Sequence, residues 1–297
     1  MGVLSRCVDW WRHNAQSTVA MAAHDYHEVY TGVLGDMASH GLTDVAGLSI
    51  LDVGCGERLP NTLLFGATGA RAIGMDLEHI VRSWSPFDLA KEWRASGPKA
   101  AVKTVLRRLA FDRTYYRTLS QCAGLRLRPR SADVRVGDAC NMPFDTASID
   151  VVVSNAVFEH IADVPAAVHE IGRVLRLRGI CHVRIHNYYS LSGGHDLRWR
   201  RPDENPPKHL QPWAHLRDGG HRQFAYLNRL RPEEFRAIFE AEQALELVLF
   251  EGSDAHYERP AAPEGERFLT GGALDLLDRY SRDELLTRSY VVVCRRA

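Results

Sequence analysis

Apolar residues along the chain gather in short runs that are separated by stretches with helical spacing. The runs rich in β-branched residues cover positions 48–53, 70–76, 133–139, 148–155, 179–186, 244–250 and 289–296. Strands that alternate with helices form a mostly parallel sheet covered on both faces. The pattern therefore predicts a doubly wound α/β fold around a sheet of about seven strands.

One helix between two predicted strands is visible in detail. Apolar residues recur at helical spacing between Pro165 and Leu177, and Gly179 is expected to end this helix before the next strand. A complete strand-helix-strand unit is therefore predicted in this part of the chain.

Three segments lie outside the simple alternation. Residues 1–45 have mixed apolar spacing and predict one or two helices ending at Gly41, an N-terminal extension or cap on a main domain of residues 46–297. Residues 82–130 form a long insertion after the second strand, which we predict to be helical. Residues 187–230, rich in Gly, Pro, His, Arg and Trp, are predicted to form a substrate lid after the fifth strand.

Charge is concentrated in the first insertion. Residues 82–130 contain twelve basic and three acidic side chains, a net charge of +9, although the chain as a whole has a formal net charge of zero. Such a segment is either a solvated helical face or a patch that binds an acidic substrate, a phosphate or RNA. The neutral whole excludes a general attraction to nucleic acid or to an anionic membrane.

Length and cysteine usage indicate an intracellular globular protein. The 297 residues, 45% of them apolar, can bury one large core, and no apolar run is long enough to span a bilayer. The six cysteines are scattered without paired spacing, which favours free thiols in a reducing compartment. We therefore expect a cytoplasmic location.

The first predicted strand ends in the sequence ILDVGCG, where Asp52 is followed by Gly54 and Gly56. A strand that turns through Gly-x-Gly into a helix exposes bare backbone beside the positive end of the helix dipole. The second strand ends in Asp76, where a carboxylate can bind both hydroxyls of a ribose. A ligand with a nucleoside part is therefore indicated.

Two ligands compete for this geometry. The dinucleotide fingerprint G-x-G-x-x-G requires a glycine at position 59, where this chain has Leu59 between Arg58 and Pro60. S-adenosylmethionine has no pyrophosphate and does not need the third close approach. It therefore fits the pattern better than NAD.

These residues resemble the class I S-adenosylmethionine-dependent methyltransferases, in particular the small-molecule branch called type 11. The resemblance runs from Ser49 to Ile185. Its four motifs, in the order of the family, are residues 52–56, Asp76, residues 137–144 and residues 148–160. The resemblance implies a Rossmann-like fold, with S-adenosylmethionine as cofactor and S-adenosylhomocysteine as product.

The resemblance also implies which residues bind the cofactor. In the family the first motif faces the methionine part, the acidic residue binds the ribose, the third motif holds the adenine, and the fourth lies beneath the sulfonium. The cofactor-binding residues predicted in this way are Asp52, Gly54, Cys55, Gly56, Asp76, Leu77, Asp138, Ala139, Asn155 and Ala156.

The chain departs from the family pattern at two places. Arg58 stands where the family often has a third glycine, and the insertion of residues 82–130 is longer than a minimal member needs. After the fourth strand the sequence is Asn-Ala-Val-Phe, residues 155–158, in place of the Asn-Pro-Pro-aromatic motif of methyltransferases that act on base amines. An adenine or cytosine amine is therefore not expected as the acceptor.

Methyl transfer to a hydroxyl needs a nearby base, and histidine suits neutral pH. We favour His195, which lies in the predicted lid beside Asp196, and consider His160 next; His186 is more typical of a structural residue. The predicted substrate contacts are His186, Tyr188, Tyr189, Trp199 and Trp213. The alternative for the aromatic residues is a lid whose rings only pack back on the sheet.

Histidines are frequent near the predicted lid, which raises the question of a metal. They are His182, His186, His195, His209, His215 and His221. Their spacings match no H-x-x-x-H or H-E-x-x-H pattern, so no metal is expected from the sequence.

Together these features predict a methyltransferase that modifies a small-molecule or glycan acceptor, at oxygen, in sugar, polysaccharide or secondary-metabolite biosynthesis. One alternative is an RNA or protein methyltransferase that uses the basic insertion, although nucleic acid is not the expected partner. The other is a non-catalytic cofactor-binding protein that serves as a partner subunit. The sequence does not indicate an oligomeric state.

Overall fold

A computed structural model of the chain describes residues 17–80, 90, 93–94, 97, 102, 104–196, 199, 210–217, 226–253 and 265–297. The strands are β1 (Ser49–Val53), β2 (Arg71–Asp76), β3 (Asp133–Val136), β4 (Ile149–Asn155), β5 (Leu175–His186), β6 (Leu245–Ser253) and β7 (Ser289–Arg296). The main helices are α2 (Thr31–Ser39), α3 (Pro60–Ala67), α5 (Arg113–Ala123), α6 (Val164–Val174), α7 (Ala214–Arg217), α8 (Pro232–Ala241) and α9 (Arg282–Leu286).

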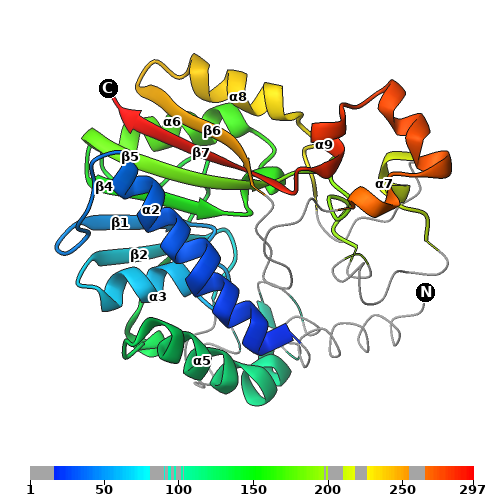
Figure 1. Cartoon of the computed structure of the whole chain (residues 1–297). Coiled ribbons are helices and arrows are strands. Elements are labelled where there is room, and N and C mark those ends of the chain that lie inside the picture. Colours follow the sequence, from blue (N-terminus) through cyan, green and yellow to red (C-terminus); the bar gives the residue numbers. More distant parts are fainter. Residues whose placement is uncertain are drawn as a thin grey trace.

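The strands form one seven-stranded sheet with the order β3-β2-β1-β4-β5-β7-β6 (Figure 1). Strands β1 to β5 run parallel to one another, and β7 runs antiparallel to both β5 and β6. The predicted doubly wound, mostly parallel sheet is therefore confirmed. The strand order reverses between β1 and β4, and in such sheets ligands bind outside the carboxyl ends of the strands at this point.

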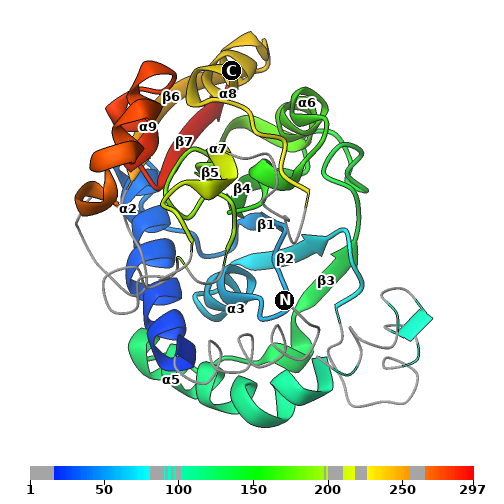
Figure 2. The same ribbon diagram turned by 90° about the vertical axis from the view of Figure 1, so that its right-hand side faces the viewer.

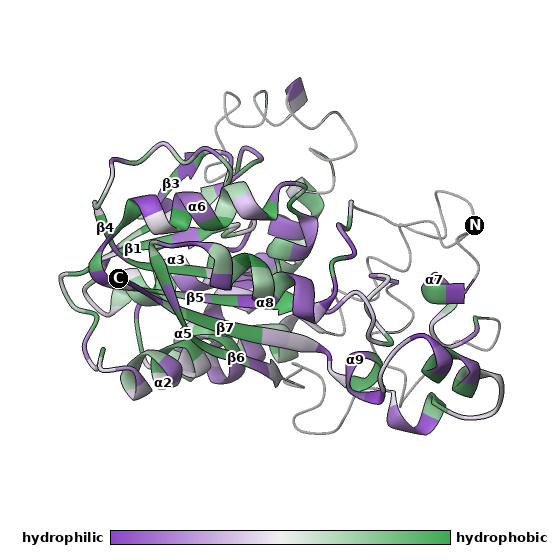
Figure 3. Cartoon of the chain, turned by 90° about the horizontal axis from the view of Figure 1, so that it is seen from above, coloured by the Kyte–Doolittle hydropathy of each residue, from purple (hydrophilic) through white to green (hydrophobic). Residues whose placement is uncertain are grey.

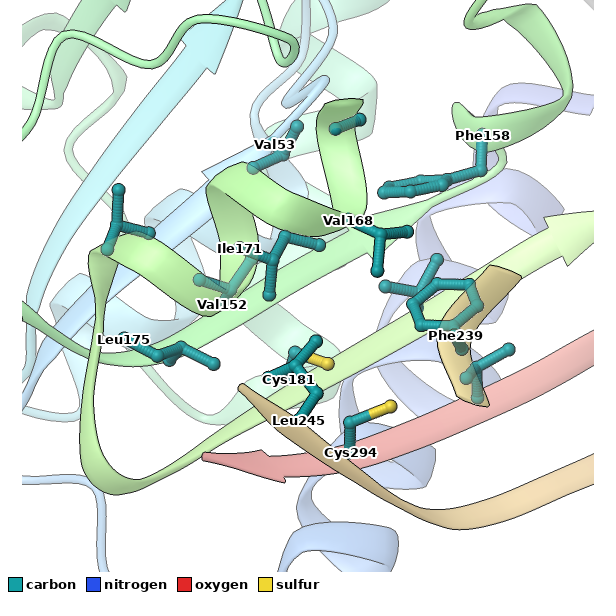
Figure 4. Close-up of a cluster of buried hydrophobic side chains, with 14 of the residues drawn as sticks. Val53, Val152, Phe158, Val168, Ile171, Leu175, Cys181, Phe239, Leu245 and Cys294 are labelled. Carbon is teal, nitrogen blue, oxygen red and sulfur yellow. The ribbon is translucent and has the colours of Figure 1, made fainter. Parts of the chain in front are cut away.

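Helices cover both faces of the sheet, as a sheet of buried parallel strands requires (Figures 1 and 2). One face packs against α6 and α8 through a core that includes Val152, Ile171 and Phe239 (Figure 4). The other face packs against α2, α3 and α5 through a second core that includes Phe65 and Tyr115. Burial of each such side chain contributes about 1.5–3 kcal/mol, so the two cores hold the sheet as a rigid platform.

Helix α6 is amphipathic, and hydrophilic and hydrophobic colours alternate along it in Figure 3. It begins at a capping residue, Asp163, whose carboxylate accepts a hydrogen bond from the Ala166 amide at 3.0 Å. It ends earlier than the predicted limit at Leu177. Leu175 has already adopted an extended backbone and pairs with Ile149 in β4, because strand pairing and burial there outweigh the helical pattern.

The N-terminal segment is helical from residue 17 to Ser39 and ends just before Gly41, as predicted. Val33 and Met37 of α2 are buried against the sheet. The Nε2 atom of His182 in β5 lies 2.7 Å from a carboxylate oxygen of Asp36 in α2. The segment therefore packs directly on the sheet.

The two predicted insertions differ in structure. The described part of the first is helical over residues 104–123, as expected, and ends at Gly124. The described part of the second lies with α7 and α9 beyond the carboxyl ends of the parallel strands (Figure 1). Most of residues 82–103, and residues 197–198, 200–209 and 218–225, lie outside the described part, and so do His209 and His221. No helix in the described part is both long and apolar enough to cross a membrane.

Candidate functional site

The loop after β1 is shaped by contacts that exclude a side chain. Gly54 has φ +69°, and a Cβ atom at this position would lie 2.2 Å from Cγ2 of Val157. The amides of Gly54 and Cys55 donate to the carbonyl oxygen of Met75 at 2.7 and 3.1 Å. The glycine loop, residues 54–56, is therefore fixed to the end of β2 and passes directly over the turn after β4.

Asp76 is held by the same loop. The Gly56 amide donates to Oδ2 of Asp76 at 3.0 Å, and the Glu78 amide donates to Oδ1 at 3.2 Å. A carboxylate oxygen has two acceptor sites, so each oxygen retains one for a ligand hydroxyl. The neighbouring Leu77 leaves 71% of its side chain exposed. An oriented carboxylate beside an exposed apolar side chain suits a nucleoside.

The carboxylate of Asp52 is buried and is bonded within the protein. It is 2% exposed, and its Oδ2 accepts hydrogen bonds from the Thr62 amide at 3.0 Å and the Thr62 hydroxyl at 2.7 Å. Burial raises the pKa of Asp52 to about 6, and the bonds from Thr62 oppose that rise. The carboxylate thus ties β1 to helix α3 beneath the glycine loop.

Cys55 and Arg58 also contribute to the loop from within. Cys55 is 5% exposed, and burial raises the pKa of its thiol, so only its backbone faces the carboxyl edge of the sheet. The Arg58 guanidinium forms an ion pair with Asp112 at 3.3 Å and lies 4.7 Å from the ring centre of Tyr115. Where the family has a glycine, this chain therefore has a link between the loop and its helical insertion.

The remaining predicted cofactor residues lie at the ends of β3 and β4. The Oδ1 atom of Asp138 accepts a hydrogen bond from the Cys140 amide at 2.9 Å, which closes the turn that contains Ala139. Asn155 ends β4, and Ala156 follows with φ +55° and donates its amide to the Arg184 carbonyl at 2.8 Å. All ten predicted positions therefore lie at the ends of β1 to β4 or in the turns that follow them.

Three predicted histidines come together on the other side of the turn after β4. The ring centres of His160 and His195 are 4.9 Å apart, and those of His186 and His195 are 4.8 Å apart, both in edge-to-face orientation. We call His160, His186 and His195 the histidine cluster. It lies next to the end of β4, beside the predicted sulfonium position, and combines residues that are far apart in the sequence.

Hydrogen bonds orient two of these rings. The Nδ1 atom of His160 lies 2.8 Å from the carbonyl oxygen of Tyr226, which can only accept, so Nδ1 donates and, in the neutral ring, Nε2 has the lone pair. The Arg288 guanidinium donates to the Ser192 hydroxyl at 3.0 Å, and that hydroxyl lies 3.3 Å from Nε2 of His186. Ser192 can therefore donate onward to His186.

Glu159 is a further polar residue in this region. It is 2% exposed, its Oε2 accepts the His186 amide at 3.4 Å, and its Oε1 lies 3.8 Å from Nε2 of His160. Burial raises the pKa of Glu159 to about 8. Asn228 clamps the turn that carries it, through bonds to the carbonyls of Phe158 and Ile161 at 2.7 and 2.9 Å.

Sequence patterns did not single out Glu159 or Val157. A glutamate between Phe158 and His160, directly after a buried strand, is the only local signal for a buried acid here. No sequence motif marks Val157, whose side chain occupies the space that a Cβ atom at Gly54 would need. Both residues are defined by contacts across the fold.

The predicted substrate-binding aromatic residues occupy a small apolar core. Tyr188, Tyr189, Trp199 and Trp213 are 7%, 8%, 4% and 0% exposed and pack against residues of 269–286. The indole Nε1 of Trp213 donates to the Tyr189 carbonyl at 3.1 Å, and Nε2 of His215 lies 2.8 Å from the Tyr188 carbonyl. These positions favour the alternative in which the rings pack, and leave His186 as the candidate at the site.

The basic insertion lines a cavity of about 730 Å³ next to Leu59 and Ile80. Its basic lining residues are Arg107, Arg108, Arg113, Arg126, Arg128 and Arg130. Arg107 forms ion pairs with Glu57 and Asp112, so part of the positive charge is compensated inside the protein. None of the three histidines of the histidine cluster lines this cavity.

Two sequence comparisons relate part of this chain to methyltransferases. The profile of the type 11 family, described as a methyltransferase domain, matches residues 112–183. A Mycolicibacterium smegmatis protein assigned as an S-adenosylmethionine-dependent methyltransferase is 39% identical over 74 residues, which are 25% of this chain and 29% of that protein. The match thus spans less than a third of the relative's length.

Two solved structures are similar to this chain over most of its length. An S-adenosylmethionine-dependent methyltransferase from Mesorhizobium loti is 14% identical, with a TM-score of 0.46 and coverage of 89% of this chain and 97% of the other. A Listeria monocytogenes protein given the same description is also 14% identical, with a TM-score of 0.49 and coverage of 93% and 98%.

Proposed function

The chain belongs to the class I S-adenosylmethionine-dependent methyltransferase family, and we propose that it transfers a methyl group to an oxygen atom of a small-molecule or glycan acceptor. The donor of this family is S-adenosylmethionine, and the product is S-adenosylhomocysteine. The observation that carries the choice of oxygen is the histidine cluster at the end of β4, where the hydrogen bond of His160 Nδ1 makes Nε2 the lone-pair nitrogen of the neutral ring.

On this proposal, Asp76 binds the ribose and the glycine loop lies along the methionine part of the donor. The carboxylate is already oriented by two backbone amides, so binding requires little further ordering. Leu77 and the turn at Asp138 and Ala139 contact the adenine, in the positions that the family resemblance implies. The ends of β1 to β4 thus supply a complete set of contacts for the donor.

The transfer itself is an in-line displacement in which the acceptor oxygen forms a bond to the methyl carbon as the carbon–sulfur bond breaks. The protein must align the three atoms and exclude water. His160 or His195 accepts the hydroxyl proton, because a hydroxyl becomes a good nucleophile only as it loses that proton. His186 positions the acceptor from the other side of His195.

One observation favours a second candidate, an RNA or protein methyltransferase that holds its substrate through the basic insertion. The arginine-lined cavity beside Leu59 suits an anionic group. It competes poorly with the first candidate, because Arg107 is already paired with Glu57 and Asp112. Binding of RNA there would weaken steeply with salt.

The third hypothesis, a non-catalytic cofactor-binding subunit, depended on Arg58 in the glycine-rich motif. The side chain of Arg58 is directed to Asp112 and Tyr115, away from Gly56. The guanidinium is therefore engaged by the helical insertion, and Arg58 gives no support to this third hypothesis. We place the reaction in the cytoplasm, as the unpaired cysteines predict.

Labelled donor distinguishes these candidates. The purified protein is incubated with methyl-labelled S-adenosylmethionine and a bacterial extract, and the label is partitioned by size, ribonuclease and protease treatment. The proposal predicts label in a small or glycan fraction that resists both enzymes and mild base-catalysed ester cleavage. Label that ribonuclease or protease releases would transfer support to the second candidate, and absence of labelled product would contradict both.

A further inference from the structure

Beyond the methyl transfer, we infer that Glu159, His160 and His195 form a binding site for a divalent cation. One ligand atom from each of these residues can be chosen so that all three lie within 4.8 Å of one another. Two imidazole nitrogens and one carboxylate oxygen are a donor set of zinc, iron(II), cobalt(II) and manganese(II) sites. The spacing in the sequence does not reveal this set, because His195 lies far along the chain from the other two.

The strongest observation is the carboxylate of Glu159. The residue is 2% exposed, and its Oε1 makes no hydrogen bond with any described residue. A buried polar atom without a partner is costly and rare in native proteins. This atom lies 3.8 Å from Nε2 of His160, so it faces into the cluster. A cation between the two would supply the missing partner.

His160 has the hydrogen bonding that metal-ligating histidines use. Its Nδ1 donates to the Tyr226 carbonyl at 2.8 Å, which orients the ring, and its Nε2 lies 3.8 Å from Oε1 of Glu159. Metal-bound histidines almost always donate their second ring nitrogen to a carbonyl or carboxylate in this way. The bonds from Asn228 to the carbonyls of Phe158 and Ile161 hold both ligands on one rigid turn.

His195 is positioned by a tightly packed turn. The turn before it leaves no room at Gly193, where a Cβ atom would lie 2.0 Å from the Tyr188 carbonyl oxygen. His195 itself has φ +54°, a conformation that non-glycine residues adopt rarely and often at functional sites. The backbone thus accepts strain in the conformation that brings this ring to the cluster.

The three ligand atoms must move closer together to coordinate an ion. Ligands at about 2.0–2.2 Å from zinc lie roughly 3.3 Å apart in a tetrahedron, so rotation of the side chains must bring the atoms inward. The Oε1 atom of Glu159 and Nε2 of His160 are 3.8 Å apart, and the three ligand atoms lie within 4.8 Å of one another, so the movements required are small. Both histidines are partly exposed, which gives an ion a path of entry.

Three protein ligands leave coordination positions open for water or for an acceptor oxygen. This role for the cation rests on the proposed function, whereas its binding depends only on the three side chains. A cation that binds the acceptor oxygen would lower the pKa of its hydroxyl, and the proton would pass to solvent instead of to a histidine.

Cobalt(II) binding tests the site directly. The full-length protein is stripped with EDTA and titrated with CoCl2, with calorimetry and visible ligand-field absorption as readouts. We expect saturable binding of one ion per chain. Loss of a ligand in Glu159→Gln or His195→Asn should weaken binding by at least the roughly 10–100-fold seen for changes in supporting residues. Circular dichroism verifies folding, and His195→Asn provides the second variant if Glu159→Gln does not fold.

The matched control is His169→Ala. His169 is another histidine beside a glutamate, 3.1 Å from Glu242, but it lies on the exposed surface of α6. Its loss should leave cobalt affinity unchanged. Absence of saturable binding, or binding that only His169→Ala reduces, would overturn the site. S-adenosylhomocysteine is titrated into the same samples, so a wild-type protein that binds the nucleoside but not cobalt contradicts the cation site and leaves the methyltransferase proposal intact.

Discussion

One buried carboxylate lies near the glycine loop and another near the histidine cluster, and the two differ in their hydrogen bonding. Asp52 and Glu159 are both 2% exposed, and burial raises both pKa values, to about 6 and about 8. Asp52 accepts two short hydrogen bonds from Thr62, whereas Oε1 of Glu159 has no hydrogen-bond partner in the described part of the chain. The first carboxylate completes the scaffold, and the second keeps capacity for a ligand.

The difference extends to the residues around them. On the proposed donor side, the candidate contacts are backbone amides and glycines, and their positions follow from the strand ends. On the proposed acceptor side, the candidate contacts are side chains from the turn after β4, the end of β5 and residues 192–195. We infer that the proposed donor site is preorganised by the backbone, whereas the proposed acceptor site depends on how separate segments pack together.

The largest effect is expected when both candidate bases are removed. The double substitution of His160→Ala and His195→Ala should lower the rate of methyl transfer by about 10²–10⁴-fold, the typical contribution of general acid–base catalysis. Affinity for S-adenosylhomocysteine should stay within about threefold of the wild type, because neither ring contributes to the donor side. A parallel loss of affinity would show that the two sides are not separate, and His169→Ala serves as the control.

Gly54→Ala should damage the donor side through its backbone. Alanine at a positive φ costs about 1–2 kcal/mol, and its overlap with Val157 adds roughly 1–3 kcal/mol. Thermal unfolding and calorimetry with S-adenosylhomocysteine measure the two consequences. Adding Val157→Ala should recover the stability lost through the overlap with Val157, but not the stability lost because alanine is held at a positive φ.

Gly56→Ala is the matched control for that variant. Gly56 has a similar φ of +64°, but a Cβ atom there meets nothing within 4 Å. It should therefore lose only the backbone cost, about 1–2 kcal/mol. Equal losses in the two glycine variants would refute the role given to Val157.

Asp76→Ala should weaken binding of the cofactor product by roughly 2–4 kcal/mol, because two hydrogen bonds to the ribose, with a charged acceptor, are lost. Calorimetric titration with S-adenosylhomocysteine measures the change. Part of the loss comes from the glycine loop, since the Gly56 amide loses its acceptor. Unchanged affinity would place the nucleoside elsewhere.

Asp52→Asn should change the pH dependence of stability by up to about 3 kcal/mol. The pKa of Asp52 is raised in the folded state from 3.8 to about 6, so the folded state binds the proton more tightly than the unfolded state. The resulting stabilisation is fully present below about pH 4 and is lost as the pH rises through about 6. The wild type should therefore lose stability relative to the variant between pH 4 and 7.

Urea unfolding of both proteins at several pH values measures this difference. Because the asparagine amide adds a constant cost of its own, the slope with pH is the informative quantity. A difference in stability that does not vary with pH would show that Asp52 is ionised at both ends of the range.

Features set by local sequence were predictable, whereas features set by the packing of separate segments were not. All seven strands were predicted because β-branched runs bounded by turns reflect local pattern, and the turn at Gly54 follows from its sequence. The end of α6 was misplaced, because Leu175 is extended by pairing with Ile149 in β4. The histidines were recognised one by one, but their meeting depends on the packing of the turn at Gly193 against Tyr188. Trp213 was expected to face a substrate and is buried by a C-terminal segment that carries no signal of this contact.

The most direct test of the account is a calorimetric titration of the purified protein with S-adenosylhomocysteine, with NADH as the control ligand. If the glycine loop and Asp76 bind a methyl donor, S-adenosylhomocysteine should bind saturably at micromolar concentration, with a binding free energy of about −8 kcal/mol, and NADH should not bind. Binding of NADH, or of neither ligand, would contradict the assignment of the glycine loop and Asp76 to a methyl donor.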